Sequence, residues 1–155
     1  MVKKERGEIV RISINVDDKI ETTEIMISCK RLTPEIERII ATLRILDQQL
    51  TVHKLDEMYI IDSSKVLYME AVDRKTFVYT KNEVYESTLK LYELEERLES
   101  LGFLRVSKSC ILQLKWIKSL RADFDRKIRV TMENEEQIIV SRQYSEGLKR
   151  RLGVK

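Results

Sequence analysis

The sequence predicts a mostly β protein of the α+β class, built from small antiparallel sheets. Two observations carry this prediction. Short apolar runs recur from residue 50 to residue 140, and brief polar linkers such as residues 62–64 and 73–75 separate them. Two other stretches, residues 36–46 and 91–101, repeat their apolar residues with helical spacing. We therefore expect strands through most of the chain, with a few helices set between them.

The first 47 residues predict a ββα unit. Residues 9–16 form a strand-like run, in which apolar and polar side chains alternate from Val10 onward, and residues 24–29 form a second one. Thr33 and Pro34 favour a helix start, because threonine can cap a helix and proline at the first helical position loses no useful donor. The apolar stripe of this helix consists of Ile36, Ile39, Ile40, Leu43 and Leu46.

A unit of this size has too little apolar surface to form a core by itself. The apolar stripe of its helix could pack on the rest of the same chain or on a second copy of the chain. We expect residues 1–47 to be a dimerisation or regulatory element and residues 48–155 to form the main domain. We favour a homodimer.

The main domain alternates strands with brief turns. A helix is expected at about residues 88–101, where a leucine stripe lies opposite a face rich in glutamate, and Gly102 is a natural stop. A last helix is expected at residues 144–152. The predicted strands are residues 50–55, 58–62, 66–72, 76–80, 83–87, 103–106, 110–114, 117–124, 126–133 and 137–140.

Positive charge is concentrated in the last third of the chain. Residues 103–155 hold 13 basic and 6 acidic groups, an excess of seven, although the whole chain has a net charge of only +3. Residues 48–102 instead hold 7 basic and 11 acidic groups. Such an imbalance favours a polyanionic partner, but a basic run can equally be a solvated surface.

Other features exclude several classes of protein. The chain has no apolar run long enough to cross a bilayer, and we expect no signal peptide, because the first residues are basic without an apolar stretch after them. Cys29 and Cys110 lack metal-ligand spacing, so we expect reduced thiols in a cytoplasmic protein. With one histidine and no phosphate-binding glycine loop or nucleophile elbow, the chain is expected not to be an enzyme and to bind no cofactor or metal.

Several segments between residues 50 and 153 follow one another in a recognisable order. They are VLYMEA at 66–71, TFVYT at 76–80, the helix at 91–101, FLRVSKSCIL at 103–112, Ile117, VSRQY at 140–144 and Leu148. With these segments, residues 50–153 resemble the LytTR DNA-binding domain of bacterial transcription regulators. Ser107 stands where the family usually has histidine, and Gln113 where it usually has asparagine.

The resemblance implies a sequence-specific regulator that binds double-stranded DNA through loops, which enter successive major grooves and touch the minor groove between them. The chemistry of the loops agrees, because an arginine fork can pair with guanine and short hydroxyls suit phosphate oxygens. The residues expected to contact DNA are Arg74, Lys75, Thr76, Arg105, Ser107, Lys108, Ser109, Arg142 and Gln143.

Alternatives stay open for several of these residues. Arg105 could be a strand-end residue paired with an acid, and Lys75 could be plain solvated surface. The basic third could also bind an acidic protein, which would make the chain an interaction module.

Stand-alone members of the family are often held by a small membrane protein, so the resemblance also implies a membrane-protein inhibitor as a partner.

Overall fold

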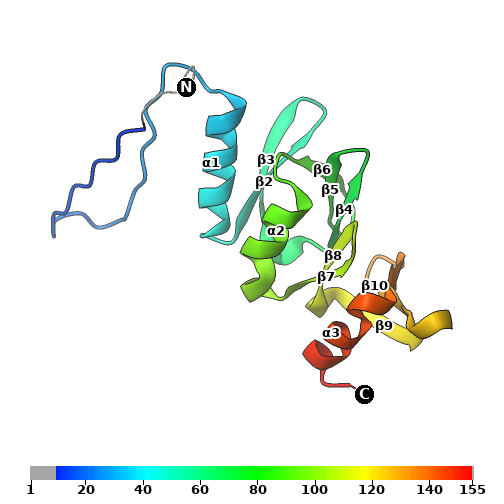
Figure 1. Cartoon of the computed structure of the whole chain (residues 1–155). Helices are drawn as coiled ribbons and strands as arrows, with labels where there is room; N and C mark the ends of the chain where they lie inside the picture. The colour runs from blue at the N-terminus through cyan, green and yellow to red at the C-terminus, as the bar shows by residue number, and fades with distance from the viewer. Residues whose placement is uncertain (1–9, 155) are drawn as a thin grey trace. The chain divides into compact units, whose positions relative to one another are not determined.

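The computed structural model describes residues 10–154, which fall into two units: residues 10–31 and residues 32–154. The larger unit contains three α-helices and ten strands (Figure 1). The helices are α1 (Pro34–Ile45), α2 (Leu91–Leu98) and α3 (Arg142–Leu152). The strands are β2 (Gln49–Lys54), β3 (Glu57–Asp62), β4 (Tyr68–Val72), β5 (Lys75–Tyr79), β6 (Val84–Ser87), β7 (Phe103–Ser107), β8 (Cys110–Gln113), β9 (Ile117–Ala122), β10 (Ile128–Met132) and β11 (Gln137–Val140).

The strands form two antiparallel sheets, as the sequence predicted. Seven strands lie in the order β3-β2-β6-β5-β4-β8-β7, and three lie in the order β11-β10-β9. Every predicted strand from residue 50 onward is present, with ends that differ by a few residues. The helices are too short or too polar to cross a bilayer, as far as the described residues go.

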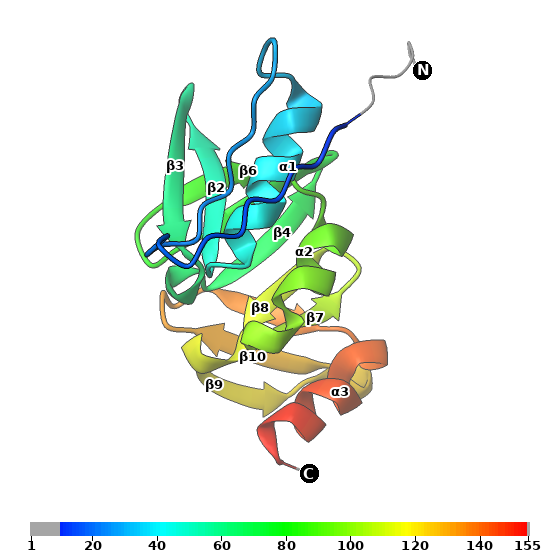
Figure 2. The ribbon, with the colours of Figure 1, turned by 90° about the vertical axis from the view of Figure 1, so that its left-hand side faces the viewer.

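Each face of the seven-stranded sheet contributes to a different core. Helices α1 and α2 lie on one face (Figure 2), where Ala41, Leu94 and Met69 belong to one buried cluster. On the other face, side chains such as Leu112 meet the three-stranded sheet and α3, including Leu148. Adjacent residues of a strand point to opposite faces, so a single strand serves both cores.

The start of α1 and the end of α2 follow their local chemistry. The Thr33 hydroxyl accepts a hydrogen bond from the Ile36 N–H at 3.3 Å, and Pro34 occupies the first turn of α1. A short 3-10 turn extends α2 to Leu101 and ends at Gly102, whose φ of 87° is the left-handed conformation that favours glycine. In α2, Leu94 and Leu98 are fully buried, and each contributes about 2 kcal/mol through its burial.

The N-terminal ββα unit is only partly formed. The structure places no strand over residues 10–31, where every side chain is exposed and one turn joins the Ile20 N–H to the Asp17 carbonyl. The strands predicted at residues 10–16 and 24–29 were therefore wrong for the described part of the chain; Ile9, where the first run begins, lies outside it. An alternating pattern supplies side chains for a sheet, but an isolated hairpin without a partner is marginally stable.

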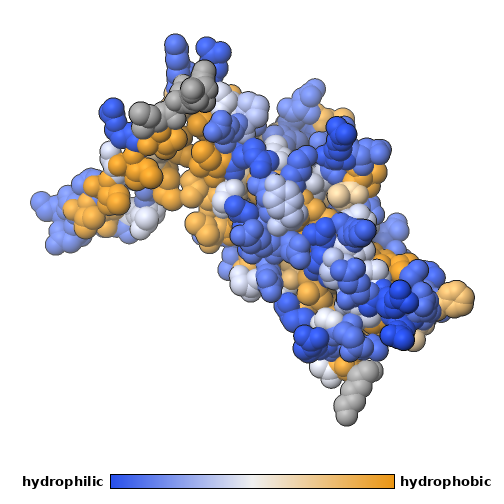
Figure 3. Space-filling view, viewed as in Figure 1, coloured by the Kyte–Doolittle hydropathy of each residue, from blue (hydrophilic) through white to orange (hydrophobic). Residues whose placement is uncertain are grey.

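The third element of that unit, α1, packs with residues beyond position 47. Ala41 and Ile45 are buried in the same cluster as Leu50 and Val52 of β2. The buried face of α1 is thus centred on Ala41 and Ile45, which the predicted stripe did not include. Ile39 and Leu46 remain 41% and 80% exposed, and apolar side chains gather over α1 in Figure 3.

Candidate nucleic-acid interface

The turn between β4 and β5 exposes two of the predicted contact residues. Asp73 and Arg74 both have left-handed backbone conformations, with φ of 50° and 68°, which is the geometry of a tight two-residue hairpin turn. Arg74 and Lys75 are exposed, and the Arg74 carbonyl accepts a hydrogen bond from Lys90 Nζ at 3.0 Å. The turn is therefore fixed at its backbone, while its cationic side chains are exposed and form no ion pair with another residue between positions 10 and 154.

Thr76 does not share this exposure. It is only 3% exposed, because it follows Lys75 on β5 and so points to the opposite face of the strand, the side on which Val78 is buried. The expectation that its hydroxyl meets a phosphate is corrected on this ground.

The turn between β7 and β8 is organised by Arg105. Its guanidinium donates hydrogen bonds to the carbonyls of Ser107, at 2.7 Å, and Lys108, and it pairs with Glu95 of α2 at 2.7 Å. The alternative that Arg105 pairs with an acid is therefore the arrangement observed. The Ser107 hydroxyl accepts from the Ser109 N–H at 3.2 Å, so Ser107 also serves the turn.

Lys108 and Ser109 occupy the tip of this turn and are both exposed. Lys108 forms no ion pair with another described residue.

Cys110, directly after this turn, is buried, and burial together with the nearby Glu70 charge raises the pKa of its thiol to about 12. A thiol of this kind stays protonated and unreactive at neutral pH, as expected for a buried cysteine.

The predicted contact segments lie beside one another, although they are far apart in the sequence. The Ala71 N–H, just before the β4–β5 turn, donates to the Ser109 carbonyl at 2.8 Å. On the other side, the Ser141 N–H donates to the Val106 carbonyl at 3.0 Å. The β7–β8 turn thus lies between the other two segments and is hydrogen-bonded to the strand ends that carry them.

The third segment is the start of α3. Ser141 occupies the position before the helix, and Arg142 and Gln143 form its exposed first turn, in which there is no acidic residue. Arg142 Nη1 lies 3.3 Å from Asp125 Oδ1, with the two side chains 60% and 62% exposed. Such an exposed pair is worth little in water, so the guanidinium can exchange it for another acceptor.

Asp125 belongs to a loop that the sequence did not single out. Residues 123–127 connect β9 to β10, and the carbonyl of Arg126 accepts a hydrogen bond from the Ser145 hydroxyl of α3 at 2.9 Å. The available signal was the basic pair Arg126-Lys127, but the sequence placed it at the start of the strand predicted at residues 126–133, and the structure begins that strand only at Ile128. Only the three-dimensional structure places the pair beside Arg142.

Gln113 has a structural place away from these turns. Its buried side-chain amide donates to the carbonyls of Val66, at 2.6 Å, and Ser63, at 3.1 Å. These bonds join β8 to the chain that leads into β4. The residue that departs from the family pattern at this position therefore acts within the fold.

Comparison with known proteins agrees with this geometry. The model of the family described as LytTr DNA-binding domain matches residues 56–153. The chain belongs to the LytTR DNA-binding domain family. The LytTR match includes all nine predicted contact residues and leaves α1 and β2 outside it.

A solved LytTR structure shows the same fold. The LytTr DNA-binding domain of a Bacillus cereus protein described as a methyl-accepting/DNA response regulator is 29% identical to this chain, with a TM-score of 0.65. The similarity covers 68% of this chain and 97% of that one. The LytTR core is therefore common to both proteins.

Relatives of full length are also found in Staphylococcus aureus. An uncharacterized HTH-type transcriptional regulator of strain MSSA476 is 27% identical over 148 residues, which cover 94% of this chain and all of the relative. A regulator of the same description in strain NCTC 8325 is 26% identical, with the same coverage of both chains.

The names of these relatives refer to a helix-turn-helix. Between residues 10 and 154 of this LytTR chain, strands separate each α-helix from the next, so the described part contains no helix-turn-helix.

Proposed function

We propose that this chain is a bacterial transcription regulator that binds specific sequences of double-stranded DNA through its turns. One observation carries the proposal: the β7–β8 segment is hydrogen-bonded to the β4 end on one side and to Ser141 on the other, and the three segments expose Arg74, Lys75, Lys108 and Arg142. Family membership and the names of the relatives support the same function.

The turns suit different parts of DNA. Arg142 can present two parallel donors to guanine O6 and N7 once it leaves Asp125. Lys108 stands at a turn tip and can reach a base acceptor or a phosphate, and Arg74 and Lys75 suit phosphates. Arg105 acts indirectly, because its donors already hold the β7–β8 turn. We infer that the turns enter successive major grooves.

The proposal includes a homodimer. Ile39 and Leu46 of α1 are exposed among the described residues, so this side of α1 offers an apolar surface to a second copy of the chain. Two linked copies would bind paired DNA sites more tightly than one copy, because the second contact becomes intramolecular.

By the resemblance to the family we also propose that the protein is cytoplasmic and that a small membrane protein binds and inhibits it.

Selection from a random duplex pool, followed by a salt titration of the enriched site, tests the function. We expect enrichment of one sequence pattern and a log–log salt slope of about −4 to −6, for some five or six phosphate contacts per subunit. No enrichment together with salt-insensitive binding would reject it and favour an acidic protein as the partner.

A further inference from the structure

The loop between β9 and β10, residues 123–127, presents two cations that the described residues leave unpaired. Arg126 and Lys127 are both exposed, and neither side chain forms an ion pair or a hydrogen bond with another residue between positions 10 and 154. Phe124 in the same loop is 77% exposed. Exposed cations without an acidic partner suit the phosphate oxygens of a nucleic acid backbone.

The loop is held in one conformation. Asp123 accepts a hydrogen bond from the Phe124 N–H at 2.8 Å, and its own N–H donates to the Lys127 carbonyl at 2.8 Å. Asp125 and Arg126 have left-handed backbone conformations, with φ of 57° and 62°, which ordinary side chains adopt at some cost. The Ser145 bond to Arg126 attaches the loop to α3. A fixed loop loses little entropy when it binds.

Each acid around this loop has a partner other than Arg126 or Lys127 in the free protein. Asp123 pairs with Arg129 at 3.0 Å and Asp125 pairs with Arg142 at 3.3 Å. Glu146 of α3 faces Lys149 at 3.9 Å. When Arg142 leaves Asp125 for a base, the two cations Arg126 and Lys127 still outnumber that one unpaired acid, so positive charge remains in surplus at this surface.

A hollow of about 370 Å³ lies between the loop and α3. Its lining includes four cations, Arg126, Lys127, Arg142 and Lys149, and the two paired acids Asp123 and Glu146. Hydrophilic side chains cover most of the surface over α3 in Figure 3. The hollow adjoins Arg142, so a group bound there would lie next to the base that Arg142 contacts.

We propose that the 123–127 loop is a further DNA contact, in which Arg126 and Lys127 bind backbone phosphates next to the base pair contacted by Arg142. The inference rests on the proposed function and extends it beyond the turns that the sequence indicated. Backbone phosphates are the part of DNA that suits this surface, because it carries surplus positive charge. The side chains of Arg126 and Lys127 also extend from a backbone that is held in one conformation. The loop then fixes the register of α3 on the duplex and carries no sequence information itself.

The test compares two double variants with the same change in charge. Arg126→Gln with Lys127→Gln removes the proposed contacts. Lys115→Gln with Lys118→Gln removes two exposed cations near the opposite end of β9. Binding of the enriched duplex and of an unrelated duplex is measured by fluorescence anisotropy across a salt series, with thermal unfolding as a check of the fold.

We expect the loop variant to bind both duplexes more weakly, by a similar factor. The slope of log affinity against log salt should become less steep by about 2, at roughly 0.9 per lost phosphate contact. The control variant should change the slope far less. The inference would be overturned if the loop variant had the same salt slope as the control variant. It would also be overturned if the loop variant lost its preference for the enriched duplex. Absence of a salt slope in the wild type would instead reject the proposed function itself.

Discussion

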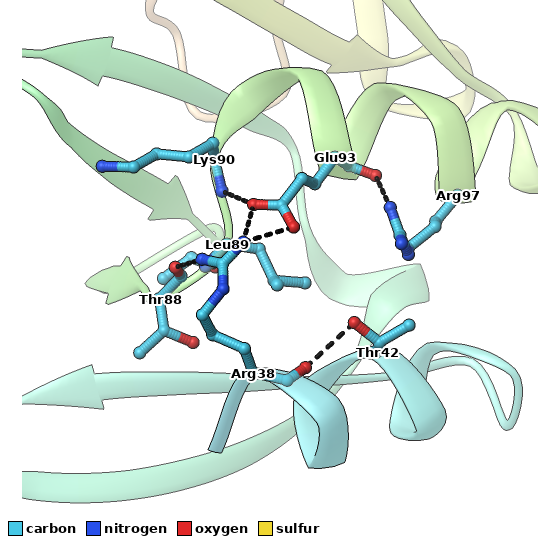
Figure 4. A network of polar contacts seen from close by, with 8 residues as sticks. Arg38, Thr42, Thr88, Leu89, Lys90, Glu93 and Arg97 are labelled. Atoms are coloured by element: carbon cyan, nitrogen blue, oxygen red, sulfur yellow. Dashed lines mark hydrogen bonds and ion pairs between the residues drawn. The ribbon is translucent and has the colours of Figure 1, made fainter. Parts of the chain in front are cut away.

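Arg38 of α1 forms a bidentate contact with Glu93 of α2, in which both carboxylate oxygens lie 2.6 Å from Nη2 (Figure 4). The same guanidinium donates to the Thr88 carbonyl at 3.0 Å. Glu93 also accepts from the Lys90 N–H at 3.0 Å, and Lys90 Nζ reaches the Arg74 carbonyl in the β4–β5 turn. A helix outside the LytTR match is thereby linked to a turn that we place on DNA.

Replacing Arg38 with methionine should lower the free energy of unfolding by about 1–2 kcal/mol, because Glu93 would lose a charge-assisted partner in a half-buried position. Urea unfolding measures the change. The matched control is Lys118→Met, which breaks the exposed pair with Glu135 and should cost at most about 0.5 kcal/mol. Equal effects of the two variants would contradict the role given to Arg38.

Stability should also fall in acid through Glu93. Burial opposes ionisation of this carboxyl, but the hydrogen bonds from the Lys90 N–H and from Arg38 outweigh it and hold its pKa below the usual 4.5. A lowered pKa in the folded state stabilises the protein above pH 4.5, and this contribution is lost as the pH falls through the folded pKa. Urea midpoints between pH 3 and pH 7, at about one-unit steps, should fall more steeply for the wild type than for Glu93→Gln.

Replacing Gln113 with leucine should destabilise the fold by about 1–3 kcal/mol, because the Val66 carbonyl would be buried without its donor. DNA affinity of the folded fraction should stay unchanged, since Gln113 lies inside the protein. Chemical unfolding and duplex binding of the same preparation separate these effects. A loss of affinity without a loss of stability would mean that Gln113 serves recognition.

Replacing Ile39 and Leu46 with glutamate should convert the proposed dimer to a monomer and leave the fold intact, because both side chains are exposed on α1. Sedimentation velocity at matched concentration measures this, with Leu55→Glu, in the exposed β2–β3 turn, as the control. A wild type that sediments as a monomer at micromolar concentration would refute the dimer.

Much of the fold was predictable from local patterns. The strands from residue 50 onward, the caps at Thr33 and Gly102 and the position of the turns all follow from short-range chemistry. The face of α1 was not predictable, because apolar residues cover more than one side of that helix, and the position of the sheet decides which side is buried.

The exposure of the candidate site was predictable, and its internal contacts were less so. Arg74, Lys108 and Arg142 are exposed at turns or at a helix start, and their contact with DNA stays a prediction. The part played by Arg105 depends on Glu95, which comes from a different element, and the 123–127 loop meets Arg142 only through the packing of α3. Contacts between distant segments of this kind have no signature in a single sequence.

The measurement that tests the central claim most directly is protection of guanine N7 from methylation on the enriched duplex. We predict two protected patches in successive major grooves, about one helical turn or 10 base pairs apart, for each bound subunit. Arg142→Ala should abolish one patch, cost about 1–3 kcal/mol of binding free energy and relax sequence preference there. A single continuous patch, or protection that Arg142→Ala leaves unchanged, would contradict the account of DNA binding through these turns.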